Sequence, residues 1–188
     1  MTEHRYRLPD GVGGAPILRG GVAVWRGARE VTVLDGRGAR RLAADCAIDR
    51  IELTADGQFV LALGDSHRRA QVWDTRSGAR VLDASDERRH SLSGGLATIG
   101  GAPYALLAVR NKTMSITDLR DGSSRGWLSI TGYTWFQVER VLGLNPASLA
   151  VVGHIEGEQD DTVIVLPAAA ALDNNQAIAS ALQFQVVE

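Results

Sequence analysis

Short stretches in which apolar and polar residues alternate recur along the whole chain, separated by turns rich in Gly, Asp, Asn and Pro. Alternation with a period of two predicts β-strands with one buried face, and the turn residues mark their ends. Three stretches end in an Asp followed by a Gly-containing turn: VTVLDGRGAR (31–40), AQVWDTRSGAR (70–80) and MSITDLRDGSS (114–124). A fourth, TVIVLP (162–167), has Pro167 in place of the Asp. The pattern therefore predicts an all-β chain.

These stretches recur at a regular distance. The residue before each Asp or Pro serves as an anchor, and the successive anchors lie 39, 44 and 49 residues apart at Leu34, Trp73, Thr117 and Leu166. Periods of this length are typical of propeller blades. Another apolar strand precedes each anchor strand: GVAVW (21–25), FVLALG (59–64), YALLAV (104–109) and SLAVVG (148–153). Turn signals come before those strands, at Gly13–Pro16, Asp56-Gly57, Gly100–Pro103 and Asn145-Pro146.

Further strands are expected on both sides of these pairs. The innermost strand of the first unit is expected at HRYRL (4–8), which is similar to DRIEL (49–53). Outer strands follow the anchors: ARRLA (39–43), ARVLD (79–83), RGWLSI (125–130) and LQFQVV (182–187). Four strands joined by tight turns predict a four-stranded antiparallel blade, repeated four times.

The second unit carries the clearest motif. The stretch LTADGQFVLALGDSHRRAQVWDTRSGARVL (53–82) resembles a WD repeat in its Asp56-Gly57 turn and its Trp73-Asp74 pair. The resemblance implies a single β-propeller domain over 1–188, with blades near 1–43, 48–83, 96–130 and 133–187. By position Asp118 corresponds to Asp74. In the family an Asp in the turn before the anchor strand ties strands together; Asn111 and Asp160 stand six residues before their anchors and take that place, while Asp65 stands eight before Trp73. The Gly-His pair typical of the family is missing from the expected loops.

Each blade of a propeller is apolar on both faces, so blades must stack on one another. The four tryptophans, Trp25, Trp73, Trp127 and Trp135, are therefore expected to pack between blades. Four blades can form a small closed ring. They can also form an open half-ring, whose apolar end faces would be covered by a second copy of the chain or by a different protein. Both alternatives stay open here.

Charge, apolar content and cysteine content indicate which binding partners and which compartment to expect. The formal net charge of −2 provides no positive electrostatic potential that would attract nucleic acid. No apolar stretch is long enough to span a bilayer. The N-terminus lacks the apolar core of a signal peptide, so a cytoplasmic protein is expected. Cys46 is the only cysteine, which excludes an intramolecular disulfide and disfavours a thiolate zinc site. Lys112 is the only lysine among 20 basic residues, a bias typical of GC-rich bacterial genomes.

Three motifs with the residue types of catalysis or ion binding are better explained as turns. Gly122–Gly126 matches the G-x-S-x-G pattern around Ser124, but it joins two predicted strands rather than a strand and a helix. Adjacent residues such as Asp65-Ser66-His67 cannot supply the geometry of a triad. The acidic loop IEGEQDD (155–161) matches no known ion loop, and a solvated turn is favoured. The histidines are scattered along the chain. We therefore expect no catalytic residue, cofactor or metal.

The sequence thus predicts a non-enzymatic scaffold for protein–protein interaction or a subunit of a larger assembly. The alternative is a propeller enzyme or a small-ligand-binding protein with its site at the central channel. Two segments between predicted strands depart from the repeat. DASDERRHSLSGG (83–95) contains Arg88, Arg89 and His90, which could contact an acidic partner or lie in a solvated loop. In PAAAALDNNQAIASAL (167–182) the run of alanines favours a short helix.

Overall fold

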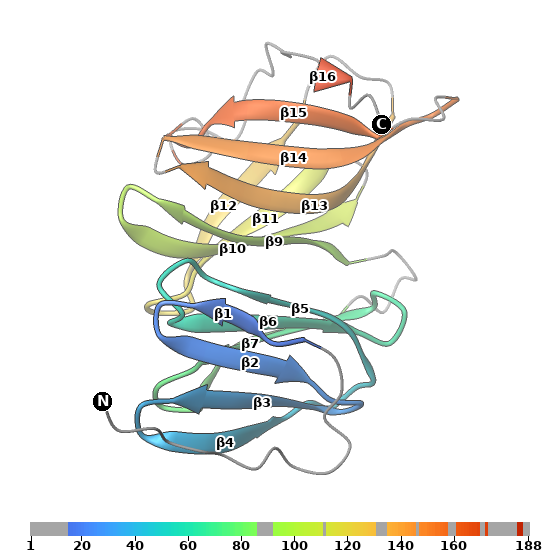
Figure 1. The fold of residues 1–188 in the computed structure, drawn as a ribbon. Coiled ribbons are helices and arrows are strands. Elements are labelled where there is room, and N and C mark those ends of the chain that lie inside the picture. The colour runs from blue at the N-terminus through green and yellow to red at the C-terminus, as the bar shows by residue number, and fades with distance from the viewer. Residues whose placement is uncertain are drawn as a thin grey trace. The chain divides into compact units, whose positions relative to one another are not determined.

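The computed structural model describes residues 15–85, 92–110, 112–130, 135–145, 147–157, 161–169, 172 and 184–185. They form four sheets of four antiparallel strands each, with strands adjacent in sequence also adjacent in space (Figure 1). Sheet A is β1 (Ile17–Arg19), β2 (Val22–Arg26), β3 (Glu30–Asp35) and β4 (Gly38–Ala43). Sheet B is β5 (Ile48–Leu53), β6 (Phe59–Gly64), β7 (Arg69–Asp74) and β8 (Arg80–Ser85). Sheet C is β9 (Ser93–Ile99), β10 (Ala102–Arg110), β11 (Thr113–Asp118) and β12 (Ser124–Ser129). Sheet D is β13 (Phe136–Asn145), β14 (Ser148–Ile155), β15 (Thr162–Pro167) and β16 (Phe184–Gln185).

The all-β prediction and the antiparallel four-stranded units are confirmed. The chain divides into two compact units, residues 1–83 and 84–188, each built on two sheets. In the first unit a core of Val, Leu, Ile and Trp73 side chains lies between sheets A and B. In the second unit an equivalent core between sheets C and D includes Phe136, Leu106 and Met114. That all four blades form one domain stays a prediction. No helix in the described ranges is long and apolar enough to cross a membrane.

Sheet A begins later than the sequence analysis expected. Its first strand is β1, which pairs with β2 through a two-residue turn at Gly20-Gly21, where both φ angles are positive (54° and 75°). Such turns match the twist of a hairpin, and glycine adopts them without strain. A side chain at Gly20 would also overlap the carbonyl oxygen of Asp56, 1.8 Å from an added Cβ. The turn therefore lies after Pro16 rather than before it, and the expected strand 4–8 is outside the described residues.

The repeat is visible in backbone hydrogen bonds that close three of the sheets. The residue after the third strand donates its N–H to the residue just before or at the start of the second strand. The bonds are Thr75 to Gln58 (2.8 Å), Leu119 to Pro103 (3.0 Å) and Ala168 to Ala147 (2.8 Å). The fourth sheet makes this bond even though Pro167 stands where the others have Asp, so it belongs to the same repeat.

The two units also repeat each other. The first sheet of each has a Gly-Gly turn, at Gly20-Gly21 and at Gly100-Gly101, with positive φ throughout. The second sheet of each has a β-bulge in its first strand, at Asp49 and at Glu139. The fold is therefore a two-sheet unit that occurs twice, and each time the first strand of the second sheet has a bulge near its start.

Candidate functional site

Three aspartates hold the turns that follow the third strands of sheets A, B and C. The side chains of Asp35, Asp74 and Asp118 each accept a hydrogen bond from the backbone N–H two residues later, at distances of 2.8, 2.9 and 3.0 Å. This is the Asx-turn, in which a carboxylate substitutes for a backbone acceptor. Asp74 and Asp118, which the sequence analysis singled out as blade positions, thus lie in equivalent turns, and Asp35 joins them.

Asp118 is the most strongly held of the three. Its side chain is completely buried and accepts hydrogen bonds from Arg120 Nε (2.9 Å), Arg120 Nη2 (2.6 Å) and Arg125 Nη2 (2.8 Å). The bonds from Arg120, with that from Arg125, lower the pKa of the Asp118 carboxyl well below its usual range despite burial. These charge-assisted hydrogen bonds link the end of β11 to β12 and stabilise the hairpin that the two strands form.

The contacts of the Asp56-Gly57 turn and of Trp73 are also structural. Asp56 Oδ1 accepts hydrogen bonds from Thr54 Oγ1 (2.6 Å) and the Gln58 N–H (3.0 Å). Gly57 has a φ of 75°, and a Cβ there would lie 2.5 Å from the Arg19 carbonyl oxygen. Trp73 is only 3% exposed and belongs to the core between sheets A and B.

The tryptophans do not all pack as expected. Trp25 is buried and Trp135 is partly buried, but Trp127 is 48% exposed. The expectation that all four pack between blades is wrong for Trp127, which lies next to the fully buried Leu128 in β12 and so points to the opposite face of the strand. Five other residues of interest lie outside the described residues: Asn111, Asp160, Arg88, Arg89 and His90. Their proposed roles stay predictions.

The two hydrolase-like motifs fold as the sequence analysis expected. Asp65, Ser66 and His67 form a left-handed turn with φ angles of 52°, 57° and 65°. In that turn Asp65 Oδ1 accepts the Ala47 N–H (3.1 Å), and the His67 backbone N–H donates to Asp49 Oδ2 (3.3 Å). Ser124 is exposed at the start of β12, in a strand–turn–strand hairpin.

A network of charges joins the connection between sheets A and B to the outer strands of sheet B. Arg69 Nη2 lies 3.1 Å from Asp83 Oδ2 and 3.4 Å from Asp45 Oδ2, and Arg80 pairs with both carboxylates. The buried Gln71 donates to Asp45 (3.1 Å) and Asp83 (3.2 Å) and accepts the Asp45 N–H (3.1 Å). The hydrogen bond from Arg80 lowers the pKa of Asp45, helped by the one from Gln71. Because these charged side chains pair with one another, we interpret the network as structural: it links the segment between sheets A and B to sheet B. Sequence patterning missed it, since Asp45 lies outside every predicted strand.

A second group of ionisable side chains lies on sheet D. His154 Nε2 is 3.2 Å from Glu139 Oε1 and 3.2 Å from Asp161 Oδ1. The three residues come from β13, the end of β14 and the residue before β15, and their ligand atoms lie within 4.8 Å of one another. One imidazole and two carboxylates form a ligand set suited to a divalent metal. His154 and the acidic loop are visible separately in the sequence, but no local pattern connects them with Glu139.

The bulge in β13 explains that connection. Gln137 pairs with His154, Val138 with Gly153, and Arg140 with Val152, so Glu139 is the additional residue. A bulge redirects side chains and places the extra residue beside its neighbour's face. Gly153 makes the approach possible, because a Cβ there would lie 2.1 Å from the Gln137 carbonyl oxygen.

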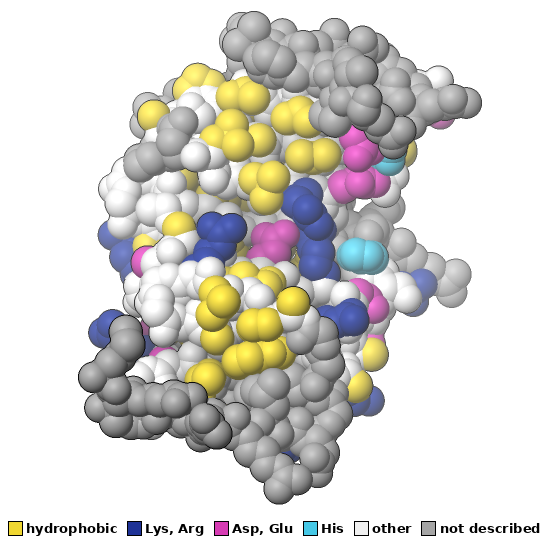
Figure 2. Space-filling model, viewed as in Figure 1, with side chains coloured by type: hydrophobic (Ala, Val, Ile, Leu, Met, Phe, Trp, Pro, Cys, Tyr) yellow, Lys and Arg dark blue, Asp and Glu magenta, His cyan; other side chains and the backbone are white. Residues whose placement is uncertain are grey.

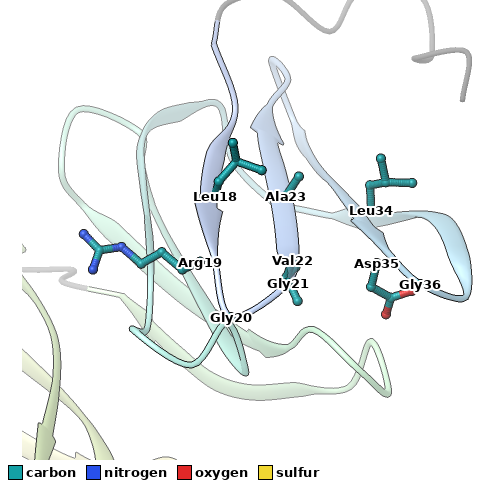
Figure 3. A pocket seen from close by; sticks show the side chains of 9 residues that line it. All are labelled: Leu18, Arg19, Gly20, Gly21, Val22, Ala23, Leu34, Asp35 and Gly36. Carbon is teal, nitrogen blue, oxygen red and sulfur yellow. The ribbon is translucent and has the colours of Figure 1, made fainter. Parts of the chain in front are cut away.

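An apolar row crosses sheet A: Leu18 is exposed, Leu34 is partly exposed, and Ala23 between them is buried. The register pairs Leu18 with Ala23 and Ala23 with Leu34, so the three share one face of the sheet, opposite the Val24 and Val33 face that packs against sheet B. Leu18 is 70% exposed. Figure 3 shows the three side chains projecting to the same side, while Arg19 points away. They line an open depression of about 530 Å³ together with the turn glycines.

Sheet D has a matching row. Leu142 pairs with Ala150 and Ala150 with Val165, on the face opposite the core of the second unit. Leu142 is exposed and Val165 is partly exposed, whereas Ala150 between them is buried. In Figure 2 hydrophobic side chains gather on the visible surface of each unit. Each unit thus presents a Leu–Ala–aliphatic row on a sheet face that its own core does not use.

Comparison with solved structures identifies the fold. No family model matches the chain, and no curated protein matches it in sequence. The chain is similar to hydrazine synthase of Kuenenia stuttgartiensis, with a TM-score of 0.63 and 12% identity over 98% of this chain and 53% of that one. It is similar to BamB of Moraxella catarrhalis, with a TM-score of 0.59 and 12% identity over 93% and 49%. It is also similar to the C-terminal WD40 domain of Sif2, with a TM-score of 0.60 and 13% identity over 88% and 43%.

The fold is a divergent β-propeller. BamB and Sif2 are propeller proteins, and the four antiparallel sheets described above correspond to blades. At 12–13% identity the likeness shows the fold alone. The propeller chain spans about half the length of these structures, from 43% to 53%.

Proposed function

We propose that this β-propeller chain is a non-enzymatic scaffold for protein–protein interaction, and that its first and last sheets dock against a second copy of the chain. The observation that carries the proposal is the pair of apolar rows, Leu18–Ala23–Leu34 on sheet A and Leu142–Ala150–Val165 on sheet D. Exposed apolar surface of this kind marks interaction sites in soluble proteins. The similar structures include an enzyme by name, so the likeness to them does not itself favour a scaffold.

A second copy fits these faces in chemistry and in number of blades. Both rows are aliphatic, so sheet A of one copy and sheet D of the other would exclude water from each other where the rows meet. Full burial of a side chain such as Leu18 contributes about 1.5–3 kcal/mol. The chain spans about half of the similar structures, so a second copy would supply a comparable number of blades. A net charge of −2 opposes self-association only weakly.

The same features favour a protein partner over nucleic acid, for which a net charge of −2 provides no electrostatic attraction. The proposal also places the chain in the cytoplasm, where a lone cysteine without a disulfide is the usual condition.

Light scattering on the purified chain tests the proposal. We expect a molar mass of twice 20.1 kDa for the wild type at micromolar concentrations. Leu18→Asp should return the mass to that of one chain, because a carboxylate would be buried in the docked face. Leu144→Asp is the matched control: Leu144 is an exposed leucine that stands in a bulge of β13 and belongs to neither row.

A wild-type chain that remains a monomer, or a Leu144→Asp variant that dissociates as fully as Leu18→Asp, would overturn docking through these rows. The scaffold proposal has a separate test. Turnover of a broad panel of esterase and glycosidase substrates by the purified chain would show that it is an enzyme.

A further inference from the structure

We propose that Glu139, His154 and Asp161 bind a divalent transition-metal ion of the Zn²⁺ class on sheet D. One imidazole nitrogen and two carboxylate oxygens are ligands that such ions prefer. The atoms that would bind the ion all lie within 4.8 Å of one another. The site is independent of the apolar rows and does not depend on the proposed scaffold function.

The spacing of the atoms fits a metal. His154 Nε2 is 3.2 Å from an oxygen of Glu139 and 3.2 Å from an oxygen of Asp161. An ion with bonds of about 2.0–2.1 Å separates its ligand atoms by about 3.3 Å in tetrahedral geometry and by about 3.0 Å in octahedral geometry. The two separations from His154 therefore fit an ion with shifts of a tenth or two of an ångström, while the oxygens of Glu139 and Asp161, within 4.8 Å of each other, would move closer together on binding. A single Nε2–H shared between two oxygens makes two bent and weaker hydrogen bonds, whereas a cation is attracted to all three atoms.

The strand register places the three ligand residues side by side in the absence of an ion. The bulge at Glu139 places this carboxylate beside His154, and the pairing of Gly153 with Thr162 brings Asp161 to the other side. Gly153 lets β13 and β14 approach at this point. Ligands fixed by strand register lose little conformational freedom on binding, which favours a defined site.

Sheet B provides an internal comparison. It has the same bulge, with Asp49 in the place of Glu139 and Gly64 in the place of Gly153. The residue after Gly64 is Asp65 where sheet D has His154. Sheet B thus keeps the bulged carboxylate but lacks the imidazole at the equivalent position, and Asp49 supplies a matched control.

The coordination sphere would stay open to solvent. The side chains of His154, Glu139 and Asp161 are 39%, 43% and 51% exposed, so water can complete the coordination. Three protein ligands with an open position differ from a closed structural zinc site, which has four. The ion would tie the start of β15 to β13 and β14.

Isothermal titration calorimetry of the chelator-treated full chain with Zn²⁺ tests the proposal. We expect one ion per chain for the wild type. Glu139→Gln, His154→Gln and Asp161→Asn should each weaken binding at least tenfold, as the loss of a ligand or its support does. Asp49→Asn should bind as the wild type does. X-ray absorption at the zinc edge should show nitrogen and oxygen neighbours at about 2.0 Å and no sulfur at about 2.3 Å, since Cys46 takes no part.

Three outcomes would overturn the proposal: no saturable Zn²⁺ binding by the wild type, unchanged binding in all three ligand variants, or a sulfur neighbour. Far-ultraviolet circular dichroism shows whether each ligand variant folds. If one does not, the other two variants and the X-ray absorption spectrum of the wild type still test the proposal.

Discussion

Gly64 and Gly153 occupy equivalent positions in sheets B and D. Each pairs with the residue just before a bulged carboxylate, Asp49 in one sheet and Glu139 in the other. A Cβ on either glycine would lie 2.1 Å from a carbonyl oxygen of the neighbouring chain segment. The first strand of each sheet therefore approaches the second more closely than any side chain permits, and this contact recurs once in each unit.

Gly153→Ala should therefore destabilise the second unit. Its methyl group would have to displace the backbone of β13, and overpacking of this kind costs about 1–3 kcal/mol. Gly36→Ala is the matched control, because a Cβ at Gly36 meets nothing within 4 Å. Urea unfolding followed by circular dichroism measures both. Equal midpoints for the two variants would mean that the close approach at Gly153 is not required.

Trp73→Ala should lower the free energy of unfolding by about 3–5 kcal/mol, since it removes a buried aromatic side chain from the core between sheets A and B. Trp127→Ala changes the same residue type at a site that is 48% exposed and should cost less than about 1 kcal/mol. Denaturant unfolding of both variants gives the comparison. The packing account of Trp73 fails if the two losses are alike.

The buried carboxylate of Asp118 makes stability depend on acid. Its pKa is lowered in the folded chain, so it stabilises the fold above the ordinary aspartate pKa of about 3.9, and that contribution is lost as the pH falls below it. Asp118→Asn should cost about 1.5–3 kcal/mol at pH 7.

The difference between wild type and Asp118→Asn should then shrink progressively below about pH 4. Unfolding by urea at a series of pH values measures it. A difference that stays constant from pH 7 to pH 3 would show that the charge of Asp118 contributes nothing to folding.

Local patterns predicted much of the fold. Apolar alternation located the second and third strands of every sheet, and the Asp-containing turns at Asp74 and Asp118 form the Asx-turns described above. These features depend on residues close together in sequence. The turn before β2 was misplaced: it lies at Gly20-Gly21 rather than at Gly13–Pro16, and the close approach of Gly20 to the Asp56 backbone is a contact distant in sequence that local patterns do not reveal.

Features that depend on register could not be predicted. Glu139 and His154 meet because of a bulge that alternation does not reveal, and Asp161 joins them through pairing of β14 with β15. The apolar rows are likewise visible only once Leu18 is known to pair with Ala23.

Chemical cross-linking between two single-cysteine variants tests the docking of sheet A on sheet D most directly. Leu18→Cys and Val165→Cys each introduce one exposed or partly exposed thiol. The native Cys46 is buried, and burial raises the pKa of its thiol, so it should not react. A short homobifunctional maleimide is added to each variant alone and to a mixture of the two. We predict a cross-linked dimer in the mixture, and little in either variant alone or when Leu144→Cys replaces Leu18→Cys. Absence of the mixed product, or equal product in every sample, would contradict the account.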